Sequence, residues 1–89
     1  MYKITTSTGS VYQVDTDQGL WKKNDDPWER IWALNAVSPD LFGKGLTRDE
    51  ILEQSTQDTI PQPGEHLYVA SRDVWWMSTS VTSVEEIDD

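Results

Sequence analysis

The sequence contains no cysteine and a single histidine, His66. Without cysteine there is neither a disulfide framework nor a thiolate metal site, the usual supports of small secreted domains. One histidine excludes a His pair on zinc, and no Gly-x-Ser-x-Gly turn accompanies any serine that would need His66 as its base. We therefore expect no catalytic residues, no metal ligands and no cofactor, and we place His66 on the surface or on an edge strand.

Basic residues and long apolar runs are also scarce. Seven Lys and Arg stand against sixteen Asp and Glu, a net charge of −9. This charge repels phosphate backbones and anionic lipid, so neither direct nucleic-acid binding nor membrane binding is expected. No run approaches the roughly 18 apolar residues of a membrane span, and no signal-peptide pattern follows Met1. The sequence predicts a cytoplasmic protein.

The 89 residues are too few for a second independent core, so we expect one domain over residues 1–89. Acidic residues crowd the end of the chain, and we expect residues 86–89 to form a frayed acidic tail. Five Trp, three Tyr and one Phe supply large apolar side chains. We expect most of them to lie in the core, because a small domain must concentrate its burial.

The first fourteen residues contain two β-rich runs around Gly9, which is a hairpin signal. A three-residue loop over 7–9, with Gly9 in the left-handed region, pairs Ile4 with Tyr12 and Tyr2 with Val14. These four large side chains then share one face of the hairpin.

The segment 28–37 fits neither the helical nor the strand period cleanly. Asp26, Pro27 and Glu29 form a good helix start, whereas the Trp and Ile content favours a strand. We favour a helix here and keep a strand as the alternative. A short strand over 20–23 precedes the segment.

A clearer helix start lies at Thr47. Glu50 answers Thr47 as a capping box, and Leu46 and Ile51 are spaced as a hydrophobic staple. The pattern predicts a short helix over 48–54.

The C-terminal part of the chain reads as an exposed connection over 55–65 and then two strands, over 66–70 and 74–85. The apolar parity changes along the second strand, which predicts a bulge near Thr82 and Ser83 or a strand passing between two sheets. The fold class is therefore α+β and mostly β: a small antiparallel sheet or partly open barrel, with an N-terminal hairpin and one or two short helices.

Adjacent strand residues point to opposite faces, so Trp75 and Trp76 cannot both enter one core. Either both sheet faces are covered or one Trp is exposed, and an exposed Trp is a typical anchor for a partner or a sugar ring. The candidate interaction surface consists of Trp75, Trp76, Trp28 and Trp32.

The two ends of the chain carry a family resemblance, through Thr6–Asp15, Leu20–Lys23 and Ser78–Glu86. They resemble small proteins encoded by phages of actinobacteria, in which a T-x-S-G-S-x-Y hairpin opens the chain, a W-x-[RK] strand follows and a T-S-x-V-x-S-[IV]-E strand closes it. The resemblance implies a phage product acting inside the host cell, without an assigned biochemical activity and without functional residues to carry over.

Residues 46–69, with Glu50-Ile51-Leu52 and the run from Ile60 to Val69, resemble the second half of a LysM domain. The LysM domain is a βααβ glycan-binding module. If residues 28–35 are helical, they would stand in for its first helix.

The leading hypothesis is a non-enzymatic phage-type accessory protein that binds a host protein. One alternative is an acidic nucleic-acid mimic that inhibits a DNA-binding host or defence protein. Another is a LysM-like glycan-binding module. A homo-oligomer paired through an edge strand is a further expectation.

Overall fold

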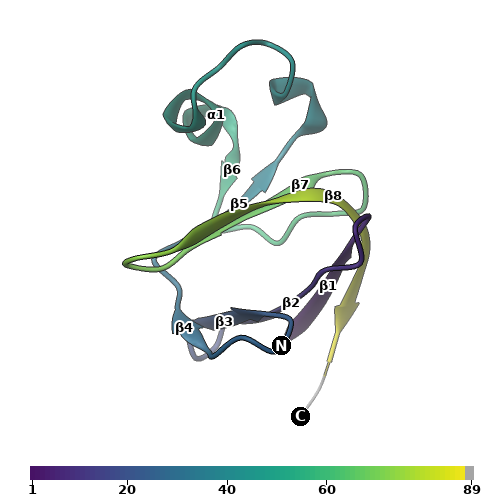
Figure 1. Cartoon of the computed structure of the whole chain (residues 1–89), viewed down its shortest axis with the longest axis vertical. Helices are drawn as coiled ribbons and strands as arrows, with labels where there is room; N and C mark the ends of the chain where they lie inside the picture. The colour runs from purple at the N-terminus through teal and green to yellow at the C-terminus, as the bar shows by residue number, and fades with distance from the viewer. Residues whose placement is uncertain (88–89) are drawn as a thin grey trace.

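The computed structural model describes residues 1–87, and most of its elements are strands (Figure 1). Eight strands form one antiparallel sheet in the order β4-β3-β2-β1-β8-β7-β5-β6, which stays open between β4 and β6. The elements are β1 (Tyr2–Thr6), β2 (Val11–Asp15), β3 (Leu20–Lys23), β4 (Glu29–Arg30), β5 (Ala33–Val37), the 3-10 turn η1 (Pro39–Leu41), α1 (Arg48–Gln54), β6 (Thr56–Gln57), β7 (His66–Ala70) and β8 (Trp75–Glu86). The predicted class, α+β and mostly β with an open sheet, is confirmed.

Strand β8 joins the two halves of the sheet. Its first half pairs with β7 and its second half with β1, and the register skips Thr82 between the pairs Thr5/Ser83 and Thr6/Val81. A bulge bends its strand, and the bulge predicted near Thr82 and Ser83 is confirmed. In Figure 1, β8 runs along the middle layer and then turns down beside β1. The chain thus forms three layers: β1–β4, then β5 and β7 with the start of β8, then α1.

The N-terminal hairpin has the predicted register. Ile4 pairs with Tyr12 and Tyr2 with Val14, and Gly9 closes the loop at φ +87°. Ile4, Tyr12 and Val14 are fully or almost fully buried, so the face of the hairpin that carries them packs into the core.

The middle layer is buried on both faces. Leu67 and Val69 of β7 pack with residues of β1–β3 in one cluster, which we call the inner cluster. Tyr68 and Ala70 pack in a second cluster beneath α1, which we call the outer cluster. A strand covered on both sides reads as a continuous apolar run and not as an alternating one. We call the α1 side of this layer the outer face.

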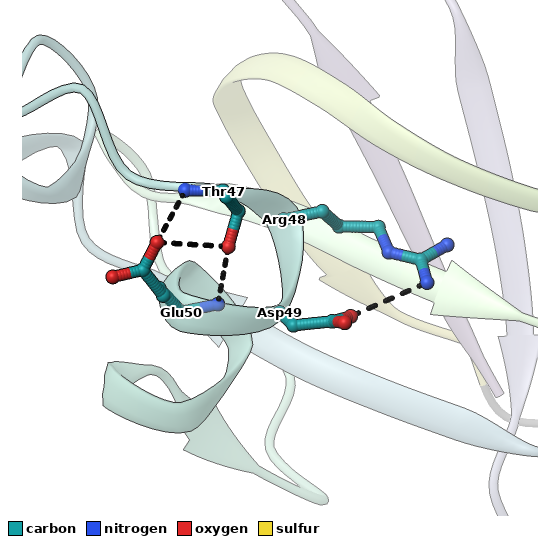
Figure 2. Close-up of polar contacts among 4 residues, drawn as sticks. All are labelled: Thr47, Arg48, Asp49 and Glu50. Carbon is teal, nitrogen blue, oxygen red and sulfur yellow. Dashed lines mark hydrogen bonds and ion pairs between the residues drawn. The ribbon is translucent and has the colours of Figure 1, made fainter.

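Helix α1 begins and ends where predicted. Figure 2 shows the capping box: Thr47 N–H donates to Glu50 Oε1 at 3.1 Å, and Glu50 N–H donates to Thr47 Oγ1 at 3.3 Å. Thr47 Oγ1 also donates to Glu50 Oε1 at 2.9 Å, and the two hydrogen bonds that the carboxylate accepts from the Thr47 backbone and side chain lower the pKa of Glu50. Leu46 packs against the outer cluster, which contains Ile51.

The helix favoured for residues 28–37 is wrong, because the segment forms β4 and β5. Asp26 lies in a turn, where its N–H donates to the Lys23 carbonyl at 3.0 Å. Leu34 belongs to the inner cluster and Val37 to the outer one, so β5 is packed on both faces. This burial outweighs the local helix-start signal.

Three further expectations differ from the structure. His66 lies half-buried in β7, between β5 and β8, and not on an edge strand. Glu86, placed in the frayed tail, pairs with Tyr2 at the end of β8, while residues 88–89 lie outside the described residues. The connection 55–65 contains β6 and the fully buried Pro61. Within residues 1–87, no helix has the length and apolar character needed to cross a membrane.

Candidate functional site

Four of the five tryptophans are exposed, so the expectation that most aromatic residues lie in the core is wrong for Trp. Only Trp21, on the inner face of β3, is buried. The exposed fractions are 64% for Trp32, 46% for Trp75, 42% for Trp28 and 39% for Trp76. These four residues are the candidate surface predicted from the sequence.

Trp75 and Trp76 point to opposite faces of β8, and both are partly exposed. Trp75 lies on the outer face, with its ring centroid 5.9 Å from that of Tyr68. Trp76 opens on the inner side, where it lines a hollow of about 230 Å³ together with Trp21 and Pro27. Neither ring is fully covered by its sheet face.

A basic side chain lies over three of the four exposed rings. Lys23 Nζ lies 3.4 Å from the Trp76 ring centroid, and Arg48 Cζ lies 4.9 Å from that of Trp75. Lys22 Nζ lies 5.3 Å from the Trp28 ring. Such cation–π contacts place the aliphatic stems of basic residues along the aromatic surface. Trp32 is the one exposed Trp without such a contact among residues 1–87.

A groove of about 360 Å³ lies on the outer face beside Trp32. We call it the Trp32 groove. It is lined by Trp32, Ala33, Asn35, Leu52, Gln57, Asp58 and Tyr68. These residues come from β5, β6, β7, α1 and the adjoining loops, so only the folded chain brings them together.

Polar groups at the Trp32 groove are held in place by local structure. Asn35 is buried, and its Nδ2 donates to Ser55 Oγ at 2.7 Å, just after α1. Ser55 Oγ in turn donates to the Leu52 carbonyl at 2.8 Å. Asp58 follows β6 in a left-handed conformation, at φ +51°. This network ties the end of α1 to β5 and fixes one wall of the groove.

The four predicted Trp residues do not form one patch. Trp75 and Trp32 both neighbour Tyr68 on the outer face, whereas Trp76 opens on the inner side. Trp28 lines a separate hollow with Met1 and Leu20. No linear pattern marks the groove residues Asn35, Gln57, Asp58 and Tyr68, because β6 is too short to show a period and Tyr68 reads as part of an apolar run.

His66 lies in a structural setting. Its Nδ1 is 3.0 Å from the Ser78 carbonyl oxygen, and its ring centroid is 4.4 Å from that of Phe42, with the two ring planes tilted by 55°. Within the described residues, no group of three His, Asp or Glu side chains is placed to hold a metal ion. Comparison with protein-family models, with curated proteins and with solved structures found no match to this chain.

Proposed function

We propose that this chain is a non-enzymatic, phage-type accessory protein that acts by binding a host protein through the Trp32 groove. The observation that carries the proposal is Trp32 itself. It is the most exposed large apolar side chain, at 64%, and it stands beside a ready-made groove.

The shape and lining of the groove suit an anchoring side chain of a protein partner. Trp and Tyr are the residue types most enriched among those that dominate binding energy, and such residues work beside well-packed pockets. Leu52 and Ala33 give the Trp32 groove an apolar lining, and Tyr68 lies in the packed outer cluster. A partner side chain seated there would bury the Trp32 ring, whose exposure to water is unfavourable in the free protein.

Affinity capture from an actinobacterial lysate tests the proposal. The wild type and Trp32→Ala are used as baits, with Trp28→Ala as the matched control, because Trp28 is also exposed but lies at a separate hollow. We expect one host protein to be retained by the wild type and by Trp28→Ala, and lost with Trp32→Ala. Capture of no specific protein, or capture indifferent to Trp32→Ala, contradicts the proposal.

Glycan binding is the second candidate, favoured by the polar groups of the same groove. Asn35, Gln57 and Asp58 place amide and carboxylate groups beside the Trp32 ring, and an aromatic face with polar groups at its border suits a sugar ring. The extended conformation of residues 28–35 removes the segment that would stand in for the first LysM helix, so this candidate rests on the groove alone.

Tryptophan fluorescence separates the two candidates. Titration with chitin oligosaccharides and peptidoglycan fragments should leave the emission of the wild type unchanged if the ligand is a protein. A saturable change that Trp32→Ala abolishes would instead establish glycan binding.

A further inference from the structure

Strand β8 has an unpaired backbone edge beside the two adjacent tryptophans. Ser71 N–H donates to the Val74 carbonyl at 2.8 Å, so these residues face each other across the β7–β8 turn. Ser71 and Val74 are a hydrogen-bonded pair, and hydrogen-bonded and non-hydrogen-bonded pairs alternate along an antiparallel ladder. Trp75 and Met77 are therefore non-hydrogen-bonded toward β7. The N–H and C=O groups of Trp75 and Met77 therefore point away from β7.

On that side, the neighbouring strand stops short. Ser7 N–H donates to the Ser80 carbonyl at 2.8 Å, and the last paired residue of β1 is Thr6, opposite Val81. Among residues 1–87, no backbone group is paired with Trp75 or Met77 on this side. A central strand of the sheet therefore offers two N–H and C=O pairs flanked by two exposed Trp rings, which is a template for strand addition.

From this edge we infer that the chain forms a two-fold symmetric dimer, in which the Trp75–Met77 edges of two copies pair antiparallel. The register follows from the alternation. Trp75 of one copy faces Met77 of the other, and Trp76 faces its own symmetry mate. Each of the two Trp75–Met77 pairs exchanges two backbone hydrogen bonds, about four in all.

The side chains suit this register. The two Trp76 rings meet at a non-hydrogen-bonded position, where Cα atoms approach to about 4.5 Å and aromatic cross-strand pairs are favourable. Lys23 lies over the Trp76 ring, and Trp76 is still 39% exposed, so part of its surface is open to the mate. On the outer face, Trp75 meets Met77, a favourable sulfur–aromatic pairing.

The net charge of −9 is not concentrated at this edge. The edge carries both signs: Lys23 and Arg48 lie on the two Trp rings and Arg72 is in the adjoining turn, while Asp26 and Glu29 line the hollow of Trp76 and Asp73 follows Arg72. Glu85 and Glu86 lie at the other end of β8, roughly 30 Å along the strand, well beyond a screening length of about 8 Å. Antiparallel pairing directs these acidic ends away from each other.

Dimerisation leaves the Trp32 groove free. The two-fold axis of a continuous antiparallel sheet is perpendicular to the sheet, so both outer faces lie on one side of the dimer. Two grooves would then face the same partner surface, and this geometry permits bivalent binding.

A single introduced cysteine tests the pairing, since the chain has none of its own. In Trp76→Cys, the two thiols lie within the Cα separation of about 4.4–6.8 Å that a disulfide spans. In Trp75→Cys they are about 8 Å apart and offset along the strand, beyond that reach. Trp32→Cys is a control for collisional cross-linking. Under mild oxidation we expect Trp76→Cys to form disulfide dimers about 100-fold faster than either control, because pairing raises the effective thiol concentration into the mM range.

Sedimentation equilibrium of the wild type completes the test. We expect a species of twice the 10.2 kDa chain mass, converted to monomer by Trp76→Glu and unaffected by Trp32→Ala. A wild type that stays at 10.2 kDa up to about 0.5 mM, or Trp76→Cys that cross-links no faster than Trp32→Cys, overturns the dimer. Loss of partner capture in Trp32→Ala, with the dimer intact, distinguishes a failure of this inference from a failure of the proposed function.

Discussion

At the scale of single residues, Trp21 is the one tryptophan in the core, and its buried indole Nε1 has no hydrogen-bond partner among residues 1–87. An unsatisfied buried N–H costs about 1–3 kcal/mol. The ring still contributes its apolar area to the inner cluster, so its stabilising and destabilising effects oppose each other.

Because the buried ring of Trp21 stabilises the fold and its unpaired N–H destabilises it, two substitutions should lower the free energy of unfolding by different amounts. Trp21→Ala should lower the free energy of unfolding by about 3–5 kcal/mol, the usual cost of a large core cavity. Trp21→Phe keeps much of the ring and removes the unpaired N–H, so its cost should stay below about 1.5 kcal/mol. Urea denaturation measures both values. A Trp21→Phe cost close to that of Trp21→Ala would indicate that the indole N–H has a partner, such as an ordered water.

The exposed tryptophans illustrate what residue type alone cannot predict. Composition indicates that large aromatics should be buried in a small domain, yet Trp75 and Trp76 protrude on opposite sides of the start of β8. The Trp75 ring is partly covered by Arg48 and the Trp76 ring by Lys23. Both basic residues are distant in the sequence and come to lie over the rings only on folding.

At the scale of elements, α1 depends on its N-terminal cap. The helix is too short to be stable alone, and it is anchored by Ile51 and the capping box. Thr47→Ala removes the cap acceptor and should lower the free energy of unfolding by about 1 kcal/mol. Thr47→Ser retains the hydroxyl and should have little effect in the same denaturation experiment. Equal losses for both variants would contradict a capping role.

The same cap makes the stability of the domain depend on pH. The Thr47 hydrogen bonds lower the pKa of Glu50 from its ordinary value of 4.5 in the folded state. Such a carboxylate stabilises the fold fully above pH 4.5, and this contribution is lost as the pH falls through the lowered pKa. Glu50→Gln should therefore flatten the decline of the melting temperature below pH 4.5, whereas Glu53→Gln, a change in the same helix outside the box, should not.

The elements that were predicted correctly carry local signals. Gly9 sets the hairpin register, and the Thr47–Glu50 pair fixes the start of α1, because both depend on neighbours within a few residues. Residues 28–37 were predicted wrongly because their local signal favours a helix, whereas pairing of β5 with β7 determines the structure. Local propensity is overridden where a strand is buried on both faces.

At the scale of the whole molecule, the fold class followed from strand signals and composition, but the site did not. The Trp32 groove is assembled from segments between residues 32 and 68, and two of its residues flank the end of β6, which is two residues long. Nothing in a linear pattern places Gln57 or Asp58 beside Trp32. The unpaired edge of β8 is likewise a property of how far β1 extends along it.

The central proposal is that the Trp32 groove is the contact surface for a host protein. The most direct test is the dissociation constant of the captured partner for the wild type, Trp32→Ala and Trp28→Ala, measured by calorimetry. Loss of a hot-spot Trp costs at least about 2 kcal/mol, so Trp32→Ala should weaken binding about 30-fold or more, with Trp28→Ala within about twofold of the wild type. Equal dissociation constants for the wild type and Trp32→Ala would contradict a binding role for the Trp32 groove.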